Sequence, residues 1–105
     1  PDLTGKWHGH HYAVTVSEGY VDRENTITVT EQKGNRFTGT VEHGGVSENF
    51  IGIIRNNNRT FYWVDTKDSG IVQGEVIRSG IIETCYLEAG ANGVAGCTVL
   101  VREQR

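Results

Sequence analysis

The sequence predicts an all-β protein that folds as an eight-stranded antiparallel up-and-down β-barrel. Its 105 residues include 12 Val, 8 Ile and 11 Thr but only 3 Leu, 4 Ala and no Met. β-Branched side chains suit a pleated strand, whereas Leu, Ala and Met are the usual helix formers. Turn signals rich in Gly and Asn recur roughly every 10 residues, which is the spacing of a sandwich or a barrel. Closing eight hairpin-connected strands removes the sheet edges, so we expect a barrel.

Seven turn signals divide the chain into eight strands of one domain, residues 1–105. Gly and Asn tolerate the positive φ of tight hairpin turns, and Asp68 is expected to stabilise its own turn. An immunoglobulin-like sandwich is the alternative, but Trp63 precedes both Cys85 and Cys97, which lie too close together in the sequence. The predicted strands span residues 5–16, 21–32, 36–43, 47–55, 59–66, 71–78, 81–88 and 96–103.

Hydrophobic alternation separates the early strands from the later ones. Trp7, in the first strand, is expected to plug the closed end of the barrel, since large aromatic side chains dominate cores. In residues 21–32, Thr alternates with Ile and Val, which leaves one face for solvent. Residues 49–54, 61–66 and 96–103 carry apolar side chains on both faces. Clustered apolar surface marks interfaces, so we expect a homo-oligomer, either a dimer or a tetramer.

Charge and hydropathy exclude several classes of function. The net charge is −3, the pI is about 5.8 and no basic stripe stands out, so we expect no nucleic-acid partner. The apolar runs are far shorter than a membrane span, so we expect no membrane association. No signal peptide is visible in a chain that begins at Pro1, which leaves secreted, periplasmic and cytoplasmic locations open.

Four segments, in order along the chain, carry the motifs of a known barrel family. Leu3–Trp7 contains the Gly-x-Trp signature of an opening strand, and residues 34–41 contain Phe-Thr-Gly-Thr. Trp63 is followed eleven residues later by Gly74, the same separation of Trp and Gly as in the fifth and sixth strands of that family. Glu83–Leu87 matches its Thr-x-Trp-Leu strand, with Tyr86 in place of Trp. Together these segments resemble the avidin family and, more broadly, the lipocalin-like (calycin) barrels. The resemblance implies an eight-stranded meander with a ligand pocket at one open end.

The positions that bind biotin in the avidin family differ in this chain. Gly9 stands where the family has Asn, and Val41 stands where it has Tyr. The loop that closes over biotin corresponds to the short segment 44–47. Gly and Val cannot hydrogen-bond a ureido group, so the resemblance implies a ligand other than biotin. Of the aromatic box, Trp63 remains, and Tyr86 partly replaces a Trp.

We expect the open end to bind a small hydrophobic or aromatic molecule, without a cofactor or a metal. Trp63 and Tyr86 would stack on this ligand, while His43 and Asp65 would give polar contacts. Two alternatives remain open. One is a small barrel enzyme (an isomerase, lyase or cyclase) with His43 and Asp65 as an internal acid–base pair. The other is a structural barrel with a filled interior and a partner on its outer face. The expected ligand-binding residues are Phe37, Val41, His43, Trp63, Asp65 and Tyr86.

The remaining histidines and the cysteines give weaker signals. His8 and His10 share one strand face, but a metal site needs a third ligand such as Glu31 or His43, so solvated histidines are expected. Cys85 and Cys97 lie on neighbouring predicted strands. The family alignment puts them on opposite faces, so buried free thiols are expected rather than a disulfide.

Overall fold

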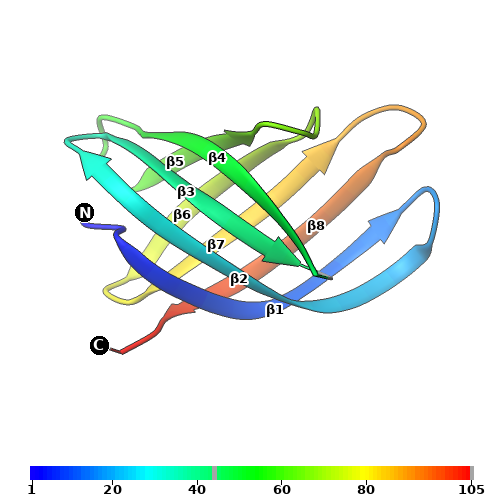
Figure 1. Cartoon of the computed structure of the whole chain (residues 1–105), viewed down its shortest axis with the longest axis horizontal. Coiled ribbons are helices and arrows are strands. Elements are labelled where there is room, and N and C mark those ends of the chain that lie inside the picture. Colours follow the sequence, from blue (N-terminus) through cyan, green and yellow to red (C-terminus); the bar gives the residue numbers. More distant parts are fainter. Residues whose placement is uncertain (44, 105) are drawn as a thin grey trace.

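The computed structural model is a closed antiparallel barrel of eight strands, which confirms the predicted fold class (Figure 1). Each strand pairs with its neighbours in chain order, and β8 closes the barrel against β1. The structure describes residues 1–43 and 45–104, and of residue 43 it describes only the backbone. Within these residues no helix has the length and apolarity needed to cross a membrane. The strands are β1 (Gly5–Thr15), β2 (Gly19–Lys33), β3 (Arg36–His43), β4 (Val46–Ile54), β5 (Thr60–Asp65), β6 (Ile71–Arg78), β7 (Ile81–Glu88) and β8 (Val94–Arg102).

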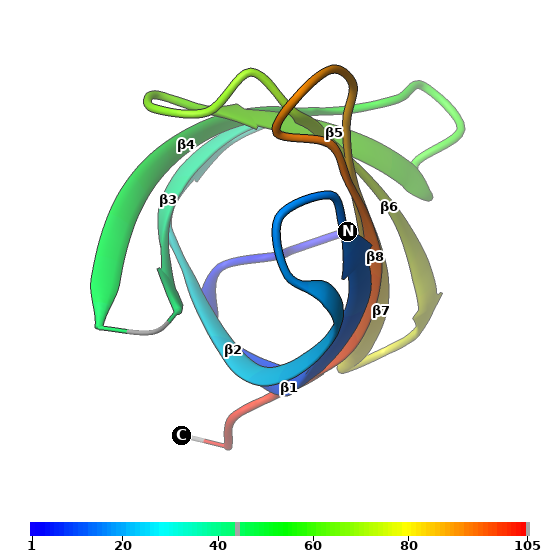
Figure 2. The same ribbon diagram turned by 90° about the vertical axis from the view of Figure 1, so that its right-hand side faces the viewer.

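The two ends of the barrel carry different parts of the chain. The N-terminus, the C-terminal segment and the β2–β3, β4–β5 and β6–β7 turns gather at one end, on the left in Figure 1. There the backbone N–H of Glu103 donates to the carbonyl of Lys6 at 2.8 Å, which ties the end of the chain to its start. The β1–β2, β5–β6 and β7–β8 connections lie at the opposite end, which faces the viewer in Figure 2.

Trp7 fills the end of the barrel where the termini lie, as predicted. Its side chain is 1% exposed, and its indole N–H donates to the carbonyl of Leu3 at 2.9 Å. The guanidinium of Arg102 lies 4.6 Å from the ring centre, within the range of a cation–π contact. The core extends from Trp7 towards the middle of the barrel. Its buried apolar residues are Leu3, Trp7, Ile27, Val29, Phe37, Phe50, Ile54, Phe61, Trp63, Val72, Ile82 and Leu100.

Three aromatic rings of the core each cover a glycine that lies directly opposite on the next strand. A Cβ atom added to any of these glycines would approach the covering ring to 2.5 Å or less, so the packing requires glycine there. Trp63 is stacked between two of the rings, with centre-to-centre distances of 4.4 Å to Phe50 and 5.9 Å to Phe61. This closed half of the barrel is therefore filled by aromatic packing. The pairs are Phe37 with Gly52, Phe50 with Gly39, and Phe61 with Gly74.

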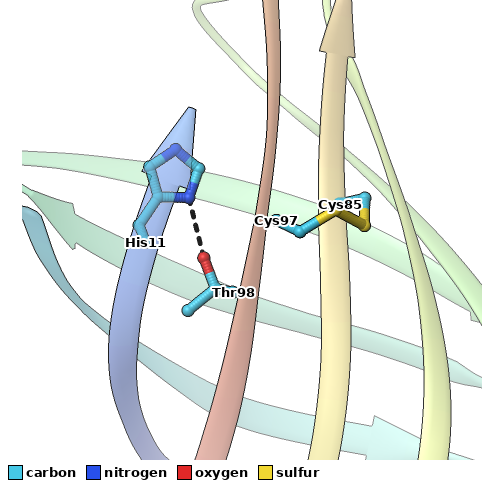
Figure 3. Close-up of a disulfide and its surroundings, with 4 residues drawn as sticks. All are labelled: His11, Cys85, Cys97 and Thr98. Atoms are coloured by element: carbon cyan, nitrogen blue, oxygen red, sulfur yellow. Dashed lines mark hydrogen bonds between the residues drawn. A yellow bond between two sulfur atoms is a disulfide. The ribbon is translucent and has the colours of Figure 1, made fainter. Parts of the chain in front are cut away.

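Cys85 and Cys97 form a disulfide, so the expectation of two free thiols on opposite faces was wrong (Figure 3). The register of β7 and β8 sets the two residues directly opposite one another, with their Cα atoms 4.0 Å apart. Both lie on the outer face, because their neighbours Thr84 and Thr98 point into the barrel. The sequence placed the cysteines on neighbouring strands, but it did not contain the register that pairs them.

Strands with two apolar faces leave apolar side chains on the outside of the barrel, as the alternation predicted. Ile51, Val64, Ile71 and Leu87 are 43–59% exposed. They are successive cross-strand partners from β4 to β7, so they form one continuous row. We call these four residues the outer apolar row. The homo-oligomer that such a row favours stays a prediction.

Candidate ligand-binding cavity

A cavity of about 360 Å³ opens at the end of the barrel opposite Trp7, the end that faces the viewer in Figure 2. It exists because the inward side chains become small or polar towards this end. In β1 the inward Trp7 gives way to His11 and Ala13, and in β8 the inward Leu100 gives way to Thr98. These side chains are too small to fill the interior as the rings do below. Apolar side chains on the cavity wall are Ala13, Val21, Ile27, Val41, Trp63, Val72, Val94 and Leu100.

Three carboxyl groups meet at one side of the cavity. The ligating oxygens of Glu48, Asp65 and Asp68 all lie within 4.8 Å of one another. Glu48 is an inward residue of β4, two positions before Phe50, and Asp65 is the last residue of β5. Asp65 Oδ1 accepts the backbone N–H groups of Lys67 at 3.1 Å and Asp68 at 2.7 Å. This local turn folds the β5–β6 connection back, so that Asp68 reaches the other two carboxyl groups.

Glu48 is the buried member of the carboxyl cluster. It is 8% exposed, whereas Asp65 is half-buried and Asp68 is exposed. Burial, followed by the negative charges of Asp65 and Asp68, raises the pKa of Glu48 from 4.5 to about 7. Desolvation and like charge both disfavour the ionised form, and here they act together. Near neutral pH this carboxyl group therefore exchanges a proton readily.

Tyr86 lines the cavity from β7, and its phenol O–H donates to Glu88 Oε1 at 2.5 Å. Burial, and then this hydrogen bond, raise the pKa of Tyr86 above its usual value, so the phenol stays protonated at neutral pH. The ring also lies against Gly70, where an added Cβ would come within 2.2 Å of it. Tyr86 is thus held in place at both its ring and its hydroxyl group.

The wall formed by β1, β2 and β8 carries polar groups of other kinds. His11 Nδ1 lies 2.7 Å from Thr98 Oγ1 inside the barrel (Figure 3). Arg23 lines the cavity and forms an ion pair with Glu18 at 3.6 Å. The side-chain oxygen of Asn25 is buried without a hydrogen-bond partner.

The structure brings four of the six expected ligand-binding residues to the cavity wall: Val41, Trp63, Asp65 and Tyr86. Phe37 lies instead in the packed core, 3% exposed, with its ring edge-on to Trp63 at 6.3 Å. The side chain of His43 lies outside the described residues, so the acid–base pair of His43 with Asp65 stays a hypothesis.

Sequence reasoning missed Glu48 and assigned Asp68 only to its turn. A signal for Glu48 was present in the sequence. It is an even number of residues away from the inward Phe50 and Ile54 on the same strand, so its side chain points to the same face. A charged residue in an inward position is unusual enough to mark a site. Asp68 gave no comparable signal, since its approach to Glu48 depends on the conformation of the turn.

The histidines of the first strand lie elsewhere. His8 and His10 are on the outer face, and His10 Nε2 lies 2.7 Å from Asp22 Oδ1. This hydrogen bond, with a second one to Glu24, raises the pKa of His10. Among the described residues, the carboxyl cluster is the one set of three potential metal ligands within 4.8 Å, and neither histidine belongs to it.

Comparison with known proteins supports the fold. The S-type phycobiliprotein lyase CPES from Guillardia theta is similar in structure, with a TM-score of 0.60 and 9% sequence identity over 98% of this chain and 89% of that chain. At this sequence identity the similarity supports the fold, a closed antiparallel β-barrel, and no more. No protein-family model and no curated protein sequence matches the chain.

Proposed function

We propose that the barrel binds a small, partly aromatic organic molecule in the cavity at its open end. The observation that carries this proposal is the cavity itself, whose volume of about 360 Å³ falls within the range of small-molecule sites. Its wall combines an apolar surface around Trp63 with many polar and charged side chains, and hydrogen bonds fix several of these, among them Asp65 and Tyr86. The structural-barrel alternative requires a filled interior, whereas the open half of this barrel contains the cavity.

Trp63 gives the cavity its aromatic surface. Phe50 and Phe61 stack on the indole and Phe37 meets it edge-on, so the ring cannot turn away without disturbing the core. An aromatic ligand can stack on such a ring with little loss of conformational entropy in the protein. Phe37 therefore supports the binding surface from behind rather than contacting the ligand.

Tryptophan fluorescence tests this proposal. Trp7→Phe leaves Trp63 as the sole indole, and a panel of small aromatic and apolar molecules is titrated into this variant. We expect at least one chemical class to change the Trp63 emission in a saturable manner. Ala13→Phe, which adds a ring inside the cavity, should abolish the response. Val14→Phe, one residue along on the outer face, should leave it unchanged. A flat response across the panel would refute the proposal.

A second candidate function, proton-transfer catalysis, is favoured by Glu48. A carboxyl group with a pKa of about 7, beside two other carboxyl groups in a cavity, has the properties of a general acid or base. Glu48 would take a proton from an acidic C–H bond of the bound molecule and return one to the resulting carbanion. Each ligand found above is incubated with the protein in D₂O and followed by NMR. Deuterium incorporation that Glu48→Gln abolishes would support catalysis, and its absence would leave binding alone.

A further inference from the structure

We propose that the molecule bound in this cavity carries an organic cation, such as a protonated amine, which the carboxyl groups of Glu48, Asp65 and Asp68 hold while its apolar part lies against Trp63. This inference rests on the proposed function, because it names the chemical class of the ligand. It is drawn from the unbalanced charge, the burial of Glu48 and the position of the aromatic surface.

The carboxyl cluster has no cationic partner in the part of the chain that the structure describes. The ion pairs among the described residues involve none of the three acids. The negative charge of the cluster is therefore not balanced by a neighbouring basic side chain. Lys67 follows Asp65 directly in the chain, yet it is exposed and makes no ion pair with the cluster. The ion pairs are Lys6–Glu103, His10–Asp22, His10–Glu24, Arg23–Glu18 and Arg59–Glu75.

Glu48 provides the second observation. Its side chain is 8% exposed and points into the cavity, and its hydrogen-bonding neighbours are the other two carboxyl groups. Among the described residues no N–H group or basic side chain donates to it. Asp65, by contrast, accepts two backbone N–H groups. Burial and the two neighbouring carboxyl groups make the ionised form of Glu48 costly, and a ligand cation would reduce that cost on binding.

The position of Trp63 distinguishes an organic cation from a bare metal ion. Trp63 and Asp65 are two residues apart on the same face of β5, which sets them about 7 Å apart. A cation joined to an aromatic ring by a short chain can contact both residues at once. A hard metal ion would use only the carboxylates and would leave the apolar wall of Val41 and Val72 without a partner.

Proton release gives the inference a specific signature. Glu48 titrates near neutral pH, and the groups that face it are Asp65 from β5 and Asp68 from the β5–β6 connection. Tyr86 and Glu88 face the same cavity from β7 and are hydrogen-bonded to each other, while His11 of β1 and Arg23 of β2 line the opposite wall. A bound cation favours ionised Glu48, so binding should expel its proton. The affinity for a permanent cation should rise about tenfold between pH 6 and pH 8.

Isothermal titration calorimetry with four molecules of one skeleton tests the inference on the intact protein. The probes are 2-phenylethylamine, trimethyl(2-phenylethyl)ammonium, 2-phenylethanol and 3-phenylpropionate. At pH 8 we expect each cation to bind at least about tenfold more tightly than the alcohol, and the anion to bind most weakly. Glu48→Gln should reduce the preference for the cations severalfold and abolish its pH dependence. Glu42→Gln, the same change on the outer face of the neighbouring strand, should alter neither.

The outcomes separate this inference from the proposed function. If the alcohol binds as tightly as the amines, the inference fails while the small-molecule function stands. If no probe binds, the inference is refuted, and the fluorescence panel decides the proposed function by itself. If Ca²⁺ binds to the cluster and the amines show no preference over the alcohol, the carboxyl groups form a metal site instead. The inference of a cationic ligand would also be overturned if cation binding took up protons or exchanged none.

Discussion

Replacing Glu48 by Gln should stabilise the folded protein at neutral and alkaline pH. The substitution keeps the shape of the side chain and removes the charge that the cavity wall tolerates poorly. A rise of the pKa from 4.5 to about 7 corresponds to about 3 kcal/mol of folding free energy that is lost when Glu48 ionises. The variant should regain most of this energy, and Gln can in addition donate a hydrogen bond to Asp65 or Asp68.

The sign of the pH dependence follows from which state holds the proton. Above its ordinary value of 4.5 the carboxyl group of Glu48 is ionised in the unfolded chain, but the folded protein keeps the proton until about pH 7. Between these values the unfolded state binds fewer protons, so stability falls as the pH rises. Glutamine does not titrate. The stability advantage of the variant should therefore be near zero at pH 4, grow through the interval and level off above pH 7.

Urea unfolding followed by tryptophan fluorescence, at intervals from pH 4 to pH 8.5, measures this difference. Glu42→Gln is the matched control, since Glu42 lies on the outer face of β3 and is exposed. Its stability should stay within about 0.5 kcal/mol of the unsubstituted protein at every pH. Parallel curves for Glu48→Gln and the unsubstituted protein, or a less stable Glu48→Gln at pH 8, would show that the carboxyl cluster is not strained.

Three further predictions concern the scaffold. Replacing Cys85 and Cys97 by Ser should cost about 3 kcal/mol in urea unfolding, because the disulfide closes a loop with a sequence separation of 12; no loss relative to the oxidised protein would contradict this. Gly74→Ala should lower the free energy of unfolding by at least about 1–3 kcal/mol, since its Cβ would lie 2.0 Å from Phe61; an unchanged midpoint would refute the packing argument. Leu87→Lys, which places a charge in the outer apolar row, should reduce the molar mass measured by light scattering if copies of this chain associate through that row; a monomer before and after the change would refute the predicted oligomer.

The strands were predictable because their signals are local. Alternation of Thr with Ile and Val in β2, and Gly or Asn between strands, are properties of a few neighbouring residues. The disulfide was not predictable in this way, because its formation depends on register. A shift of one residue between β7 and β8 would turn either cysteine to the other face. The family alignment put the two cysteines on opposite faces, which was wrong, and the hairpin turn that sets the register contains no cysteine.

The candidate site was predictable only on its apolar side. The resemblance to the avidin family placed Trp63 and Val41 inside the barrel, and both line the cavity. The carboxyl cluster joins a residue of β4, the end of β5 and a turn residue, and their meeting depends on the two backbone hydrogen bonds that Asp65 accepts. Turn conformation of this kind is set by backbone dihedrals and not by residue type alone. The acidic half of the site therefore emerged only from the three-dimensional structure.

The position of Glu48 shows where this barrel departs from the rules that the rest of it obeys. Phe50 and Ile54 follow the inward pattern of β4 and are buried among other apolar side chains, whereas Glu48 occupies an equivalent position with a carboxyl group. The aromatic packing of the closed half can sustain the fold while the open half bears this cost. A carboxyl group at an inward position that normally carries an apolar side chain lowers the stability of the fold. Such a residue beside a cavity is expected of a binding site rather than of a structural barrel. A bound cation would offset the cost of ionised Glu48, so the ligand should also raise the melting temperature of the protein. This rise should be smaller in Glu48→Gln, which binds the cation more weakly.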